Sequence, residues 1–333
     1  MARSPIAVSM GDPSGIGPDI LLATWSQGLE LNNLPDFFVT GSSKALSARA
    51  EILGLDVKFE EFHPDKSAQP GKLQVLETDV NPVGKPGQPE TADANCTIEA
   101  IDLAVDAVFK GTASAVVTCP INKDVLYGAG FTHPGHTEYL GALANEHTGE
   151  DYNPVMMLAG PQLRTVPITI HIALADVETN LTEGLIVKTA EIVNNDMQKW
   201  FGIQNPRIAL AGLNPHAGEN GKMGRGEIEK IAPAIETLKA KGINVRGPLP
   251  ADTMFHGTAR QKYDVALCMY HDQALIPAKM LGFDDAVNVT LGLPFIRTSP
   301  DHGTAYDIAG SGKANPSSFI AALRMAAEMA EKS

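Results

Sequence analysis

The sequence is poor in cysteine, in long apolar runs and in clustered positive charge. Its three cysteines, Cys96, Cys119 and Cys268, show no CxxC spacing and are odd in number, which indicates reduced, mostly buried thiols rather than a disulfide framework. No run approaches the roughly 18 apolar residues that a membrane span requires. The first residues lack the basic and apolar regions of a signal peptide. These absences predict a cytoplasmic protein that is not inserted in a membrane.

Positive charge is scarce, because 26 Lys and Arg stand against 39 Asp and Glu, a formal net charge of -13. A surface of that sign repels polyanions, which argues against nucleic-acid binding. A small anionic substrate is still compatible with this balance if a few cations gather in a cleft. At 333 residues the chain exceeds the size at which a single core stops growing, so two lobes are expected, with an active-site cleft between them.

Short apolar runs alternate with helical periodicity along nearly the whole chain, which is typical of an α/β fold with mixed sheets covered by helices. The runs that predict strands are SPIAVSM, DFFVTG, SAVVTCP, PVMMLAG, RTVPITIH, PRIALAGLN, DVALCMY and AVNVTLGLP. The amphipathic segments that predict helices lie near residues 15–29, 93–110, 179–200, 225–241 and 315–331.

Three histidines stand at the ends of three of these apolar runs. They are His171, His216 and His271. In an open α/β sheet the ligand crevice lies outside the carboxyl ends of the strands, so residues delivered there by separate strands can converge. Three neutral imidazoles with an open fourth position are typical of a catalytic zinc-type ion. Each histidine taken singly is better interpreted as a buried, hydrogen-bonded side chain, and it is their recurrence that predicts a metal site.

The first strand leads into MGDPSGIGPD, where Gly11, Gly15 and Gly17 precede Pro18. Glycines there let backbone N–H groups approach a ligand at a helix N-terminus, where an anion is favoured. The spacing is neither GxGxxG nor GxxxxGK[ST], so it is not a Rossmann or P-loop fingerprint. The segment is either a ligand-binding loop or a plain tight turn.

Polar side chains in two further segments are candidates for substrate contacts. His136 and Thr137 open an amphipathic segment, where they would lie at a helix start, although a plain Thr N-cap explains the pattern as well. Asp252 follows a stiff proline-containing stretch, and its carboxylate is a candidate base or a turn cap.

Downstream of the third histidine, Lys279, Asn288 and Arg297 stand in a span otherwise rich in glycine, proline and apolar residues. A guanidinium directly after the run LGLPFI indicates a fixed partner such as a phosphate or carboxylate. The alternative is a surface arginine, or one paired with Asp301.

Several motifs together resemble the 4-hydroxythreonine-4-phosphate dehydrogenase family of pyridoxal phosphate biosynthesis. They are GDPSGIGPD, the GHTE segment, LNPHAGENG, GPLPADT, MYHDQ and GLPFIRTSPDHGTAYDIAG, and they extend from Met10 to the last helix. The resemblance implies an isocitrate/isopropylmalate dehydrogenase-like fold. The expected lobes are residues 1–135 plus 285–333 on the cofactor side, and residues 136–284 for metal binding and dimerisation.

The resemblance also implies roles for particular positions. One divalent metal, such as Zn, Co or Mg, is expected on His171, His216 and His271. The expected substrate contacts are His136, Thr137, Lys279, Asn288 and Arg297. The expected cofactor contacts for NAD or NADP, a weaker transfer from the related dehydrogenases, are Gly303, Asp307 and Asn315.

The implied reaction is NAD(P)-dependent, metal-dependent oxidation of 4-phosphooxy-L-threonine, followed by decarboxylation, in a homodimer whose active sites combine both subunits. Asp252 and Lys279 are rival candidates for the base, and the sequence does not choose between them. It also does not choose between NAD and NADP. A dehydrogenase of 4-phospho-D-threonate or 4-phospho-D-erythronate would keep the same histidines. A metal-dependent hydrolase and a phosphate-acyltransferase-like protein are the alternatives from other classes.

Overall fold

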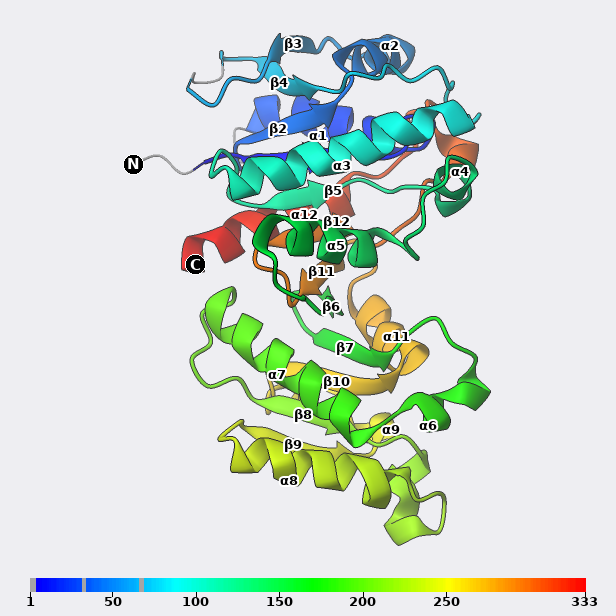
Figure 1. Cartoon of the computed structure of the whole chain (residues 1–333), viewed down its shortest axis with the longest axis vertical. Helices are drawn as coiled ribbons and strands as arrows, with labels where there is room; N and C mark the ends of the chain where they lie inside the picture. Colours follow the sequence, from blue (N-terminus) through cyan, green and yellow to red (C-terminus); the bar gives the residue numbers. More distant parts are fainter. Residues whose placement is uncertain (1–3, 32–33, 66–68) are drawn as a thin grey trace. The chain divides into compact units, whose positions relative to one another are not determined.

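The computed structural model describes residues 4–31, 34–65 and 69–333, so the first three residues of the N-terminal stretch lie outside the described ranges. The chain forms two units, which Figure 1 shows in ribbon form. Unit 1 comprises Met1–Pro154 and Leu293–Glu331, and unit 2 comprises Val155–Gly292 and Lys332–Ser333. In the described residues, no helix has the length and apolar character needed to cross a bilayer.

Unit 1 contains a wholly parallel run of strands in the order β3-β4-β2-β1-β5-β12. In that order the strands are Lys58–Glu61, Lys72–Glu77, Phe37–Gly41, Ile6–Ser9, Val116–Thr118 and Arg297–Pro300. The helices of this unit are α1 (Gly17–Leu31), α2 (Ser43–Leu53), α3 (Ala94–Phe109), α4 (Lys123–Gly128), α5 (His136–Thr148) and α12 (Ser317–Lys332). The chain leaves β1 toward β2 on one side and returns as β5 on the other, so the boundary between β1 and β5 is a topological switch point.

The core of unit 1 explains why its chain boundary differs from the predicted one. Helices α3 and α5 bury their apolar faces together with β1 and β5, in a cluster that includes Ile101, Val105, Leu140 and Val116. Residues 136–154, predicted in the second lobe, lie in unit 1, and residues 285–292, predicted in the first lobe, lie in unit 2. The apolar side chains of α5 pack on α3, and the sequence pattern alone gave no sign of that pairing.

Unit 2 has a mixed sheet in the order β11-β6-β7-β10-β8-β9. In that order the strands are Val287–Leu291, Val155–Ala159, Arg164–Thr169, Val265–Tyr270, Ile208–Ala211 and Val245–Leu249. Strand β6 is antiparallel to both of its neighbours, whereas β7, β10, β8 and β9 run parallel. The helices and helical turns are α6 (Val177–Asn180), α7 (Glu183–Lys199), α8 (Ala232–Ala240), α9 (Ala251–Met254), α10 (Gly257–Arg260), α11 (His271–Leu281), η2 (Leu174–Asp176), η3 (Pro215–Gly221) and η4 (Glu227–Ile231).

The α/β class and all eight predicted strand runs are confirmed, since each run contains a strand of the structure. The cysteines are also as expected, because all three are buried and unpaired. Helix α11 was not predicted, and the reason is Pro277, which stands inside it. Proline lacks the N–H of a helix interior and normally ends the helical pattern. Burial of Ala274, Leu275 and Ala278, on a helix that packs against β7 and β10, offsets that cost.

Candidate functional site

Two of the three candidate metal histidines lie close together at the carboxyl ends of neighbouring parallel strands. His171 follows β7, and His271 follows β10, which pairs with β7 in the register Tyr270 to Thr169. Their ring centroids are 5.9 Å apart. Two imidazoles that held one tetrahedral ion would have ring centroids about 5 Å apart. The observed separation is slightly wider than that and places the two rings side by side.

The third histidine comes from the next strand of the same sheet. His216 follows β8, which pairs with β10 on the side opposite β7. The three histidines therefore follow three adjacent parallel strands, as the sequence predicted. Only the rings of His171 and His271 form a close pair among the described histidines at these strand ends, and in the same residues no set of three His, Cys, Asp or Glu side chains surrounds one point. The triad remains a prediction.

The backbone at these histidines is unusual. His171 and His216 both have φ of 52°, in the left-handed region that side chains with a Cβ seldom adopt. Both histidines are also exposed. Their interpretation as ordinary buried core histidines is therefore wrong. Strained backbone of this kind persists only where the surroundings hold it, and it is concentrated at functional sites.

His216 begins a left-handed turn that continues through residues 217–220, all of which have positive φ. The buried carboxylate of Glu227 holds its start, since Asn214 donates to it through the backbone N–H (2.6 Å) and through Nδ2 (3.0 Å). A Cβ on Gly218 would lie only 2.6 Å from Oε2 of the same carboxylate. Glu227 thus fixes the turn that presents His216, a role that the sequence analysis missed because Glu227 lies outside the LNPHAGENG motif.

Two residues next to His271 fix its surroundings. Asp272 Oδ1 lies 2.7 Å from His271 Nδ1, which sets the ring orientation and leaves Nε2 for another partner. Gln273 is buried and accepts from the backbone of Met269 (2.7 Å) while its Nε2 donates to the carbonyl of Gly212 (2.8 Å). Because Gly212 follows β8, Gln273 ties the ends of β10 and β8 together. Sequence reasoning quoted Gln273 within MYHDQ without assigning it this role.

The two rival bases occupy different elements of unit 2. Asp252 is exposed on α9, a short helix that contacts the turn carrying His216 and has no side-chain cap. Its alternative role as a turn cap is therefore not observed. Lys279 lies on α11 with its Nζ 5.8 Å from the ring centroid of Phe283. Asn288, on β11, is half-buried, and its buried Oδ1 has no hydrogen-bond partner among the described residues. An amide oxygen in that condition is available to a ligand.

In unit 1, His136 stands at the N-terminus of α5, which is capped by Gly135 and by no side chain. Thr137 is therefore inside the helix, and its interpretation as the N-cap is wrong. Burial lowers the pKa of His136 well below its usual value, and the positive charges of Arg297 and Lys123 lower it further. His136 is consequently neutral near pH 7. Its buried Nε2 finds no partner in the described part of the chain.

Arg297 is 2% exposed, so its interpretation as a surface arginine is wrong. Its Nη2 donates to Thr118 Oγ1 at 2.6 Å, and burial lowers the pKa of the guanidinium to about 10, which leaves it charged at neutral pH. Lys123 Nζ reaches to 3.3 Å from the position of a Cβ on Gly135, beside the start of α5. Two cations and a helix N-terminus thus surround His136, an arrangement suited to an anion. Sequence reasoning missed Lys123, although it stands just after a predicted strand.

The predicted cofactor residues lie in the segment between β12 and α12. Gly303 and Asp307 are exposed, and nothing lies within 4 Å of a Cβ built on Gly303. Asn315 Oδ1 accepts from the backbone N–H (3.0 Å) and hydroxyl (2.7 Å) of Ser317, at the start of α12. The structure therefore gives Asn315 a local capping role, and it leaves the cofactor assignment of all three residues a prediction.

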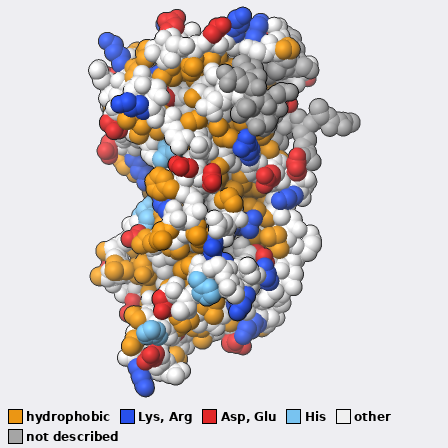
Figure 2. All heavy atoms as spheres, turned by 180° about the vertical axis from the view of Figure 1, so that it is seen from behind, with side chains coloured by type: hydrophobic (Ala, Val, Ile, Leu, Met, Phe, Trp, Pro, Cys, Tyr) orange, Lys and Arg blue, Asp and Glu red, His pale blue; other side chains and the backbone are white. Residues whose placement is uncertain are grey.

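Charge on the molecular surface agrees with the sequence balance. On the face shown in Figure 2, Lys and Arg side chains are scattered among Asp and Glu. Such a mixed face lacks the basic stripe that is typical of nucleic-acid binding.

Comparisons with known proteins agree with one another. Residues 33–326 match the family model described as pyridoxal phosphate biosynthetic protein PdxA. A 4-hydroxythreonine-4-phosphate dehydrogenase of Bradyrhizobium diazoefficiens is 52% identical over 99% of this chain and 98% of its own length. A crystal structure of the enzyme of that name from Klebsiella pneumoniae superposes with a TM-score of 0.88 at 36% identity, over 98% of this chain and 100% of the other. A terephthalate 1,2-cis-dihydrodioldehydrogenase from Burkholderia xenovorans has a TM-score of 0.66 at 25% identity, over 98% of each chain.

Proposed function

We propose, from the premise that this chain belongs to the PdxA family of pyridoxal phosphate biosynthetic proteins, that it is a 4-hydroxythreonine-4-phosphate dehydrogenase. It oxidises the C3 hydroxyl of 4-phosphooxy-L-threonine, with hydride transferred to NAD or NADP. The product, 2-amino-3-oxo-4-(phosphooxy)butanoate, then loses CO2 to give 3-amino-2-oxopropyl phosphate. The observation that carries the proposal is the 52% identity, over nearly the full length, to a relative of that name.

We assign the metal to His171, His216 and His271. Two observations support this assignment: the rings of His171 and His271 lie side by side with centroids 5.9 Å apart, and Asp272 fixes one of the two rings. Imidazole nitrogens suit Zn, Co or Ni, and oxygens from substrate and water would admit Mg or Mn. A divalent cation held there would lower the pKa of the substrate hydroxyl and stabilise negative charge on its oxygen.

The phosphate of the substrate is assigned to Arg297 and the N-terminus of α5. Arg297 supplies a buried, positively charged fork, and the first turn of α5, which no side chain caps, presents N–H groups that favour an anion. Neutral His136 can donate from one ring nitrogen, and Thr137 from its hydroxyl. Lys279 and Asn288 complete the proposed substrate contacts. Binding energy from the phosphate, remote from the reacting carbon, would orient that carbon.

The proton of the C3 hydroxyl passes to Asp252 or to Lys279. Asp252 is favoured by its place on the helix that contacts the turn of His216. Lys279 is favoured by its position on α11, the helix that begins at His271. Separate D252N and K279M variants, compared for the pH dependence of turnover, would decide between them.

We also propose that the protein is a homodimer whose active sites combine both subunits. Three large apolar side chains on or just after α11 are exposed in the single chain: Ile276 (59%), Met280 (83%) and Phe283 (73%). A second copy that covers them would remove this apolar area from water.

The test is a spectrophotometric assay of NAD(P)H formation. It compares 4-phosphooxy-L-threonine with 4-phospho-D-threonate and 4-phospho-D-erythronate, with NAD and with NADP, before and after chelation. The proposal expects turnover of the amino acid that chelation abolishes and added metal restores. Preference for 4-phospho-D-threonate or 4-phospho-D-erythronate would mean that this compound, and not the amino acid, is the substrate. Product formed without nicotinamide reduction would indicate a hydrolase.

A further inference from the structure

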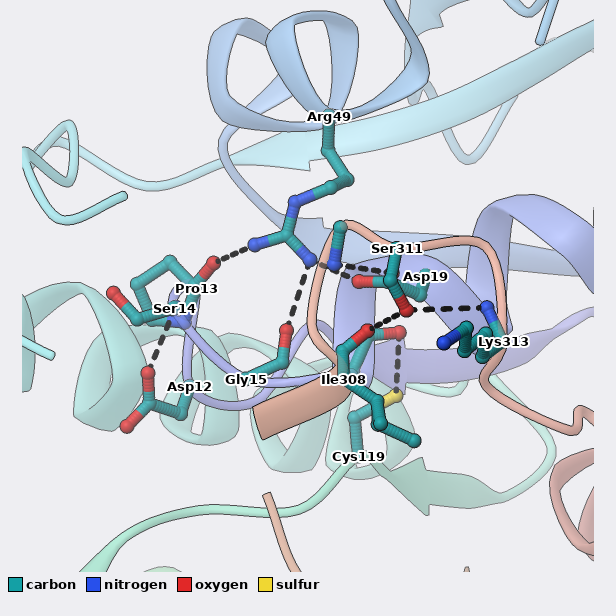
Figure 3. A network of polar contacts seen from close by, with 12 residues as sticks. Asp12, Pro13, Ser14, Gly15, Asp19, Arg49, Cys119, Ile308, Ser311 and Lys313 are labelled. Atoms are coloured by element: carbon teal, nitrogen blue, oxygen red, sulfur yellow. Dashed lines mark hydrogen bonds and ion pairs between the residues drawn. The ribbon is translucent and has the colours of Figure 1, made fainter. Parts of the chain in front are cut away.

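A buried guanidinium fixes the glycine-rich loop that follows β1 (Figure 3). Arg49, on α2, is 3% exposed, and it donates to the carbonyls of Pro13 (2.8 Å) and Gly15 (2.9 Å). It also pairs with the buried carboxylate of Asp19, in the first turn of α1. A buried charge is tolerated only when it is paired and hydrogen-bonded. Arg49 has all of these partners when residues 13–19 adopt the observed conformation, so the buried charge stabilises that conformation of the loop.

The loop so fixed is hydrogen-bonded to the segment between β12 and α12. The backbone N–H of Ile16 donates to the carbonyl of Thr304 at 2.9 Å. The second oxygen of Asp19 accepts from the backbone N–H of Gly310 at 2.7 Å. Asp19 therefore joins Arg49 on one side to Gly310 on the other.

A second buried carboxylate, that of Asp12, also connects the loop after β1 to the segment between β12 and α12. Asp12 is 2% exposed, and it accepts from the backbone N–H of Ser14 (2.8 Å) and from the hydroxyl of Tyr306 (2.6 Å). The two loops also approach very closely, since a Cβ on Gly15 would lie 3.0 Å from the Cβ of Thr304. Glycine at this position is what permits the contact.

The 302–312 segment has little regular structure of its own. Its only helical turn in the described chain is Tyr306–Ile308, which follows Ala305 at a φ of 40°. Gly303, Asp307 and Ser311 are exposed. A segment with few internal bonds takes its conformation from the elements that hold it. Here those elements are the loop after β1 and the ion pair beneath it.

We propose that Arg49 and Asp19 are positioning residues for the dinucleotide, because they hold the 302–312 segment in the conformation that presents Gly303 and Asp307. This inference rests on the proposed function and extends it to residues that lie under the loop rather than against the ligand. The planar fork of arginine can reach two carbonyls and a carboxylate together, whereas lysine offers a single nitrogen. The geometry therefore requires arginine, and not merely a positive charge.

The experiment compares R49K, D19N and Y306F with a matched control, R207K. Arg207, in unit 2, also joins a carboxylate to a carbonyl, through bonds of 2.8 Å to Asp264 Oδ1 and 3.0 Å to the carbonyl of Gln261. The dissociation constants of NADH and NADPH are measured by fluorescence, and KM for 4-phosphooxy-L-threonine by turnover. Amide hydrogen exchange is followed in the protein without nucleotide.

The dissociation constant of the preferred nucleotide should rise roughly tenfold in R49K and D19N and about fivefold in Y306F, since each loses a hydrogen bond to a charged group. KM for the phosphorylated substrate and all constants of R207K should stay within about twofold of wild type. Amides of residues 304–312 should exchange faster in R49K and D19N, while those of β1 and β5 keep their protection.

Wild-type nucleotide affinity in R49K and D19N would overturn the proposal. So would an equal rise in the nucleotide and substrate constants, or exchange that accelerates throughout unit 1, because either result indicates a general structural role. If wild-type protein binds neither NADH nor NADPH, the proposed function fails together with this inference. Turnover by wild type with unchanged variants would overturn this inference alone.

Discussion

Asp196 Oδ2 accepts a hydrogen bond of 2.6 Å from the backbone N–H of Gly292, so helix α7 is tied to the residue that follows β11. Burial raises the pKa of this carboxyl to about 6, although the amide of Gly292 and the charge of Lys199 act in the opposite direction. The group is therefore ionised at neutral pH at a cost in stability, and that cost depends on pH.

This cost can be measured. In the unfolded chain the carboxyl has a pKa of about 3.9, which is below its folded-state pKa. The stability that the protonated carboxyl gives to the folded state is therefore complete below about pH 3.9 and is lost as the pH rises through about 6. D196N keeps an oxygen that can accept from Gly292 but cannot ionise. Its free energy of unfolding should therefore rise relative to wild type by about 2–3 kcal/mol between about pH 4 and about pH 7. Parallel pH profiles in denaturant titrations of the two proteins would refute this, and D285N, at an exposed position, serves as the control.

Metal affinity should depend on Asp272, which orients His271. D272N replaces the carboxylate acceptor by an amide, which can turn its NH2 group toward His271 Nδ1 and so lose the hydrogen bond. Loss of such a partner typically weakens metal binding about 10–100-fold. Calorimetric titration with Zn or Co would measure the change. H271A should remove binding at this site, whereas D285N should leave it unchanged. Equal affinity in D272N and wild type would mean that the Asp272 contact plays no part in metal binding.

Arg297 should govern affinity for the phosphorylated substrate. R297K keeps the charge but loses the paired geometry of the fork, and R297M loses both. KM should rise roughly tenfold in R297K and at least about a hundredfold in R297M, in line with the loss of one and then more charged hydrogen bonds. Inorganic phosphate should inhibit wild type competitively and lose that effect in R297M. Unchanged inhibition would place the phosphate elsewhere.

Helix α5 should contribute to the stability of unit 1 through Leu140, which is completely buried in the cluster with α3. L140A should reduce the free energy of unfolding by about 2–5 kcal/mol, the usual cost of truncating a buried leucine. I52A, at a residue that is 55% exposed on α2, should change it by no more than about 0.5 kcal/mol. A small effect of L140A would contradict the assignment of α5 to this core.

The sequence predicted what depends on local pattern. Buried strands such as β1 and β10 are continuous apolar runs, and the three histidines were recognised because each stands at or shortly after the end of such a run. Strand β12 was missed, since RTSP is polar in sequence although all four of its residues are buried. Its polar side chains can be buried because they form hydrogen bonds with residues far away in the sequence. Arg297 donates to Thr118, and Thr298 donates to the carbonyl of Ala322.

The same distinction applies to the candidate site. Lys123 and Glu227 act through neighbours that are remote or unremarkable in sequence, so no local spacing identifies them. Arg49 reads as an ordinary helical arginine until its contacts with residues 13–19 are known. The family resemblance predicted the substrate and cofactor positions. Neither the resemblance nor the sequence pattern predicted the residues that hold those positions in place, such as Glu227 and Arg49.

The turn that begins at His216 runs with the opposite hand to every ordinary helix of the protein. In this left-handed conformation a residue other than glycine has a steric cost of about 1–2 kcal/mol, which glycine avoids because it has no Cβ. His216, Glu219 and Asn220 nevertheless stand there. Replacing Glu219 or Asn220 by glycine is therefore expected to raise the free energy of unfolding. Any loss of turnover in the same variants would measure the contribution of these two side chains to catalysis.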